Sequence, residues 1–162
     1  MVNPNVEIKY AASALRGAYA SPVQLTTTDA IEQKTSLKKG WNWISLYVNT
    51  SDMTPNGVFE KVADKVLKVK GHNKYAEPVE GSLDGNLETI ENGKMYAVKT
   101  SEDCTLRLVG SRASGSVSLV EGWNWVGYGQ QLASVTDALA DMGRVYGDIL
   151  KGQQGVAYFD TY

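Results

Sequence analysis

The chain has 162 residues, a formal net charge of −2 and a single cysteine, Cys104. This length suits one ordinary domain or two small ones. The lack of net positive charge argues against nucleic acid as a partner, and one cysteine excludes an intramolecular disulfide. No apolar run approaches the roughly 18 residues of a membrane-spanning helix, so we expect no membrane span in this chain.

Residues 1–35 are expected to form an N-terminal β segment. Val6–Tyr10 and Val23–Thr27 have strand-like composition. We interpret this segment as the tail of a preceding module. It is expected to pack as β-structure against the rest of the chain and to cover strand edges that would otherwise stay open.

The tetrapeptide Gly-Trp-Asn-Trp occurs twice, at Gly40–Trp43 and Gly122–Trp125, and holds all four tryptophans. Longer segments match at offsets of 82 and 83, namely Ser36–Ile44 with Ser118–Val126 and Val66–Lys68 with Ile149–Lys151. Self-similarity of this kind indicates a repeat. We therefore predict repeat 1 at residues 36–116 and an incomplete repeat 2 at residues 117–162.

Each repeat is expected to begin with a strand followed by a short helix. In repeat 1, apolar residues at positions 44, 46 and 48 alternate with residues 43, 45 and 47, which is the period of a strand. A helix is then predicted to begin with Thr54 as N-cap and Pro55 at the first helical position. In repeat 2, Ser134 is the expected N-cap of the corresponding helix.

Several short strands are expected after the helix of repeat 1. They are predicted at Lys65–Lys70, Leu87–Ile90, Met95–Lys99 and Thr105–Val109. Asp84-Gly85 is typical of a turn, and Asn92-Gly93 predicts a hairpin. The fold class is therefore β-rich α+β, with two related strand–helix–strand repeats, mainly antiparallel sheets and one short helix per repeat.

The paired tryptophans have two interpretations. Residues i and i+2 of a strand lie on the same face, so each pair is either a buried core anchor or an exposed aromatic platform on which sugar rings stack. The platform residues would be Trp41, Trp43, Tyr47, Trp123, Trp125 and Tyr128. We favour buried anchors because each repeat has few other large apolar residues. The Asn within each motif is expected to close a tight turn by bonding to the backbone.

No motif in the sequence indicates catalysis, and we expect neither enzymatic activity nor a cofactor. His72 is interpreted as a solvated turn residue and Cys104 as a small buried side chain. An acidic run could suggest calcium, but it lacks the spacing of an EF-hand and is interpreted as a solvated face. Its members are Glu77, Glu80, Asp84, Glu88 and Glu91, and the compensating lysines are Lys65, Lys68, Lys70 and Lys74.

The motif Leu37, Gly40–Ser45, Tyr75 and Gly81–Tyr96 resembles the GWNW-type repeats found in tandem in large modular surface or secreted proteins of Gram-negative gut-type bacteria. The resemblance extends over residues 36–162, with Gly127 in repeat 2 at the position of Ser45. It implies an extracellular or cell-surface location and a non-catalytic structural or adhesion module.

The partners that this resemblance implies are neighbouring domains of the same polypeptide, with glycans or other surface proteins as further candidates. Two alternative functions remain open at this point. One is a glycan-binding module that uses the Trp and Tyr platforms. The other is an accessory domain associated with a hydrolase.

Overall fold

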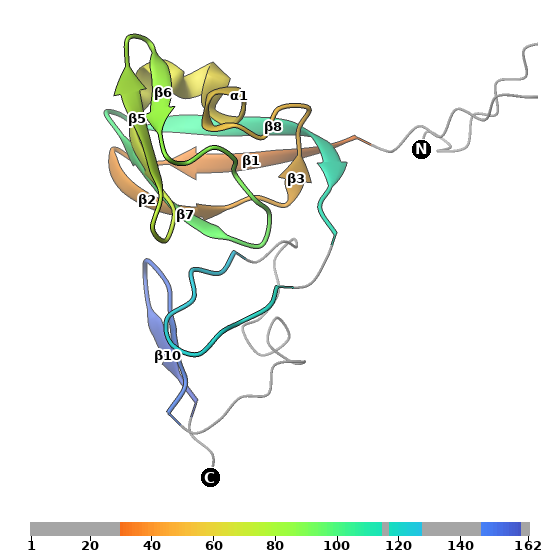
Figure 1. Cartoon of the computed structure of the whole chain (residues 1–162), viewed down its shortest axis with the longest axis vertical. Helices are drawn as coiled ribbons and strands as arrows, with labels where there is room; N and C mark the ends of the chain where they lie inside the picture. Colours follow the sequence, from red (N-terminus) through yellow and green to blue (C-terminus); the bar gives the residue numbers. More distant parts are fainter. Residues whose placement is uncertain (1–29, 115–116, 128–146, 160–162) are drawn as a thin grey trace, which may run out of the picture.

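Two antiparallel sheets share one apolar core in the computed structural model, which describes residues 30–114, 117–127 and 147–159 (Figure 1). The five-stranded sheet has the order β2-β7-β4-β5-β6 and the three-stranded sheet the order β1-β8-β3. Their strands are β1 Ile31–Leu37, β2 Gly40–Ser45, β3 Val48–Asn49, β4 Val66–Lys70, β5 Tyr75–Val79, β6 Ser82–Gly85, β7 Met95–Thr100 and β8 Cys104–Arg112. A separate hairpin pairs β9 Ile149–Lys151 with β10 Val156–Tyr158.

The predicted β-rich α+β fold class is confirmed. Every strand pair in the described ranges is antiparallel. The helix α1 Pro55–Phe59 continues as a 3-10 helix, η1 Glu60–Lys65. The second helix, expected to begin at Ser134, lies outside the described residues. So does the segment 1–29, with its two strand-like stretches.

Local sequence explains the first helix. The Thr54 hydroxyl accepts a hydrogen bond from the Gly57 N–H at 3.1 Å, and Pro55 occupies the first turn. These features satisfy or remove N–H groups that a helix leaves without partners at its start. Val58 and Phe59 then point into the core. A helix this short owes its stability mainly to that packing.

The predicted turn at Asp84-Gly85 is wrong, because both residues lie within β6. The β5–β6 hairpin turns instead at Glu80 and Gly81, whose φ angles are 49° and 87°. Positive φ at both central residues matches the right-handed twist of the flanking strands. The predicted turn was therefore four residues too far along the chain.

The predicted strand Leu87–Ile90 is also absent from the structure. Its backbone hydrogen bonds go to separate partners, from Leu87 N–H to the Tyr75 carbonyl and from Ile90 N–H to the Met53 carbonyl, at 2.9 and 2.7 Å. Both side chains are buried in the core. The apolar pattern therefore reflects burial of a loop and not pairing in a ladder.

The strand β1 crosses the boundary that we placed between residues 35 and 36. It pairs with β8 over its whole length, from Ile31 opposite Gly110 to Leu37 opposite Cys104. The described end of the N-terminal segment thus forms β-structure against repeat 1.

Candidate functional site

The first GWNW motif combines a tight turn with the start of β2, and Asn42 holds the turn together. Its Oδ1 accepts a hydrogen bond from the Lys38 N–H at 2.8 Å, and its Nδ2 donates to the carbonyls of Lys38 and Gly40 at 2.7 and 3.1 Å. Gly40 has a φ of 99°, a conformation that favours glycine. The side chain of Asn42 is only 7% exposed.

The second motif forms the same turn. Asn124 accepts from the Val120 N–H at 3.0 Å and donates to the carbonyls of Val120 and Gly122 at 2.7 and 2.9 Å. Gly122 has a φ of 91°. The prediction that the central Asn closes a turn is confirmed in both repeats.

The tryptophans of this motif do not anchor the core, which corrects our favoured interpretation. Trp41 is 42% exposed, Trp43 38% and Trp123 64%. Trp125 is half-buried. In β2 the opposite face, with Asn42 and Ile44, points inward. Medium-sized aliphatic side chains, together with Phe59 and Tyr96, fill the core without any tryptophan.

Tyr47, the third platform candidate of repeat 1, lies apart from this exposed pair. It is half-buried and packs against the core. Tyr128 lies outside the described residues. The sugar-platform residues that the structure brings to one exposed sheet face are thus Trp41 and Trp43.

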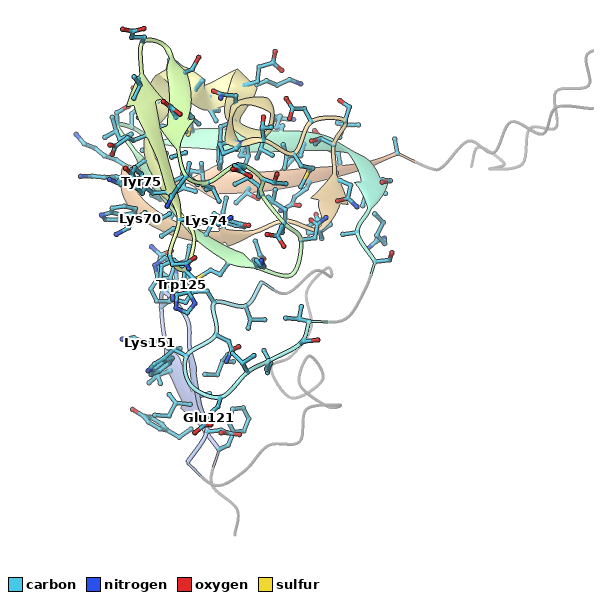
Figure 2. The ribbon with its side chains drawn as sticks, in the orientation of Figure 1. Lys70, Lys74, Tyr75, Glu121, Trp125 and Lys151 are labelled. Carbon is cyan, nitrogen blue, oxygen red and sulfur yellow. The ribbon has the colours of Figure 1, made fainter. Side chains whose placement is uncertain are left out.

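The outer face of the five-stranded sheet surrounds these two tryptophans with lysines. Residues directly opposite each other in antiparallel strands point to the same side. By this register Trp41 lies opposite Lys99, Lys99 opposite Lys68, and Lys70 opposite Tyr75. We call this surface the aromatic–lysine face, formed by Trp41, Trp43, Lys68, Lys70, Tyr75 and Lys99. Figure 2 shows Lys70 and Tyr75 projecting on the same side.

The charges on this face are unevenly compensated. Lys68 forms an ion pair with Glu77 at 2.7 Å, and its ammonium lies 4.7 Å from the centre of the Tyr75 ring. The ammonium groups of Lys70 and Lys99 each lie 5.9 Å from the centre of the Trp41 ring. These are cation–π contacts near the outer limit of their range.

The free edge of β2 is covered by two glutamine side chains. Gln153, from the β9–β10 loop, accepts a hydrogen bond from the Trp43 N–H at 2.7 Å and donates to the Trp41 carbonyl at 2.8 Å. Gln33, from β1, accepts from the Tyr47 N–H and donates to the Ser45 carbonyl, both at 2.9 Å. Each amide takes the place of a peptide group in a neighbouring strand. Such covering protects an edge from pairing with other chains.

The β4–β5 loop of repeat 1 and the β9–β10 loop of repeat 2 are equivalent. Each is closed by one backbone hydrogen bond of 2.8 Å, from the Gly71 N–H to the Lys74 carbonyl in the first and from the Gly152 N–H to the Gly155 carbonyl in the second. This equivalence implies an offset of 81 (152 − 71) and corrects the predicted offset of 83.

His72 and Gln153 occupy the same position in these two loops. His72 stacks on Trp125 of repeat 2, with ring centres 5.9 Å apart and planes 18° from parallel. Gln153 binds the backbone of Trp41 and Trp43 in repeat 1. Each repeat thus places its loop residue on the GWNW motif of the other, which is the pattern of an isologous interface.

Gly127 of repeat 2 occupies the position that Ser45 has in repeat 1, and it lies where the two repeats meet. A Cβ atom at this position would collide with the Cβ of Ser45, its counterpart in repeat 1, and with the Lys94 carbonyl. In place of the predicted strand, Val126 forms a single β-bridge with Lys94. Lys94 directly precedes β7.

A groove of about 400 Å³ lies at this junction. The β4–β5 loop with His72, the start of β7 with Lys94, and the motif residues Trp123 and Trp125 line it. The Tyr96 hydroxyl, also in the lining, accepts a hydrogen bond from the Glu91 N–H at 2.8 Å. Burial raises the pKa of Tyr96 above its ordinary value.

Several acidic side chains in the described ranges form ion pairs with lysines. No group of three or more His, Cys, Asp or Glu side chains there is arranged to hold a metal ion. Glu77 and Glu91 of the acidic run form ion pairs with Lys68 and Lys94. Cys104 is half-buried, and this burial raises the pKa of its thiol. None of the described helices has the length and apolar character needed to cross a membrane.

Comparisons of the chain with protein-family models, with curated proteins and with solved structures produced no match.

Proposed function

We propose that this chain is a non-catalytic adhesion module of a larger cell-surface or secreted protein, and that it contacts glycans through the aromatic–lysine face. The observation that carries the proposal is the exposure of Trp41 and Trp43 on one sheet face, at 42% and 38%. Large aromatic side chains gain most from burial. Two of them left on the surface of a sheet whose core is already filled favour a role in binding.

The spacing of the two rings supports contact with an extended ligand. Residues i and i+2 of a strand are about 6.6 Å apart along it, so Trp41 and Trp43 present neighbouring apolar surfaces. The flat apolar face of a pyranose ring can stack on such a surface, while lysine ammonium groups donate hydrogen bonds to its oxygens.

A structural role in a repeat array is supported by a different observation. The contact of His72 with Trp125 and that of Gln153 with β2 join the two repeats, and Gln153 makes its hydrogen bonds to the backbone of Trp41 and Trp43. The same arrangement would serve an accessory domain beside a hydrolase. The identity of the neighbouring domains would distinguish a repeat array from an accessory domain of a hydrolase. We propose contact with glycans in either case.

Titration calorimetry with a panel of neutral and acidic polysaccharides tests the proposal. The double variant Trp41→Ala/Trp43→Ala is expected to bind at least about tenfold more weakly, because one stacking contact of about 1.4 kcal/mol corresponds to that factor. Tyr158→Ala removes an exposed aromatic side chain from β10 and serves as the matched control. If no polysaccharide binds the parent protein, or if the double variant binds as well as the parent, the proposal is wrong.

A further inference from the structure

The geometry points to a specific ligand class for the aromatic–lysine face, which is an acidic polysaccharide with carboxylate or sulfate groups on its sugars. This inference rests on the proposed function, because it assumes that the face binds glycans. It adds that Lys70 and Lys99 select an anionic chain while a sugar ring stacks on Trp41.

The first support is the charge beside Trp41. Of the eight described lysines outside the aromatic–lysine face, four have a carboxylate partner within 3 Å. These pairs are Lys34 with Glu32, Lys38 with Asp103, Lys65 with Glu102 and Lys94 with Glu91. Among the described residues, neither Lys70 nor Lys99 has a carboxylate within 4.0 Å. Two uncompensated cations thus flank one exposed ring.

The second support is the cost of this arrangement to the sheet. Lys68 and Lys99 lie directly opposite each other in β4 and β7, and like charges in that position are destabilising. Glu77 neutralises Lys68, but no acidic residue of the neighbouring strands does so for Lys99. An acidic group bound between Lys70 and Lys99 would compensate the charge of Lys99, as Glu77 compensates that of Lys68.

The third support is continuity with repeat 2. Lys151 has the same place before the β9–β10 loop that Lys70 has before the β4–β5 loop, one residue ahead of the glycine that closes it. Figure 2 shows Tyr75, Lys70, Trp125 and Lys151 one below the other along the left side of the view. Both repeats thus place a lysine directly before the glycine that closes the hairpin loop.

Polysaccharides that share a backbone and differ in charge test the inference. Polygalacturonate and its methyl ester carry the same sugar units with and without the carboxylate, and dextran sulfate and dextran make the corresponding pair for sulfate. Titration calorimetry at low and raised salt is expected to show binding to at least one anionic member and at least about tenfold weaker binding to its neutral counterpart. Binding should weaken as salt rises.

Two double variants with the same change in net charge locate the effect. Lys70→Gln/Lys99→Gln is expected to reduce affinity for the anionic polymer at least about tenfold and to leave affinity for the neutral polymer unchanged. Lys34→Gln/Lys61→Gln removes two lysines from β1 and η1 and should change neither. Circular dichroism confirms that each variant is folded.

The outcomes separate this inference from the proposed function. If neutral and anionic polymers bind equally and only the tryptophan variants lose affinity, the glycan function stands and the selection of anionic chains is wrong. If no polymer binds, the proposed function fails first. Equal loss of affinity in both lysine variants, or equally tight binding of a single-stranded oligonucleotide, would show attraction of polyanions in general and would overturn the site described here.

Discussion

The substitution Asn42→Ala tests whether the turn that both GWNW motifs form is held in repeat 1 by a buried amide. The side chain of Asn42 makes three hydrogen bonds of 2.7 to 3.1 Å to the backbone of Lys38 and Gly40. A further bond of 3.4 Å reaches the Val98 carbonyl in β7. Truncation leaves these backbone groups without partners, in surroundings that water reaches only in part. At about 1 kcal/mol for each of the three shorter bonds, the free energy of unfolding should fall by about 3 kcal/mol.

Asn124→Ala is the matched control, because Asn124 makes the corresponding bonds to Val120 and Gly122. Its side chain is more exposed, so water can replace the lost partners. The expected loss is about 1 kcal/mol or less. Urea unfolding followed by far-ultraviolet circular dichroism measures both values. If the two variants lose equal stability, or if Asn42→Ala loses less than about 1 kcal/mol, burial of the amide does not decide the strength of this turn.

Two further predictions concern the junction and the first turn. Gly127→Ala should weaken the contact between the repeats, because the added Cβ would collide with Ser45 and the Lys94 carbonyl. Hydrogen exchange of the backbone amides at the edge of β2 should then be faster than in the parent protein, and unchanged exchange rates would contradict the prediction. The hydrogen bond from Lys38 lowers the pKa of the Asp103 carboxyl group in the folded protein. The ionised carboxylate therefore stabilises the fold above the unfolded pKa of about 3.9, and this stabilisation is lost as the pH falls through the lower folded pKa. Asp103→Asn should therefore lower the melting temperature at pH 7 and have little effect at pH 2, whereas equal effects at both would refute the assignment.

The sequence predicted the tryptophans of the aromatic–lysine face but not its lysines. The exposed pair Trp41 and Trp43 was recognised as a possible platform, but Lys70 and Lys99 were not assigned to it. They become neighbours of Trp41 only through the order β2-β7-β4, which no local pattern specifies. The alternation within Met95–Lys99 indicates only that Lys99 lies on one face of its strand.

The sequence by itself determined the features that depend on a few consecutive residues. The turn held by Asn42 closes within five residues, and the helix cap at Thr54 closes within four, so their chemistry is written in the local order. The alternation in β2 likewise showed that one face carries the tryptophans and the other carries Asn42 and Ile44.

Only the tertiary structure decided which of these faces is buried. Both faces of β2 carry side chains that could pack in a core, and the choice depends on what the second sheet contributes on the inner side. The strands β1 and β8 supply Leu37, Leu106 and Leu108 there, which fill the space and leave the larger tryptophans outside. The contacts of His72 and Gln153 with the opposite repeat also join residues far apart in the chain, whose proximity follows from packing and not from local sequence.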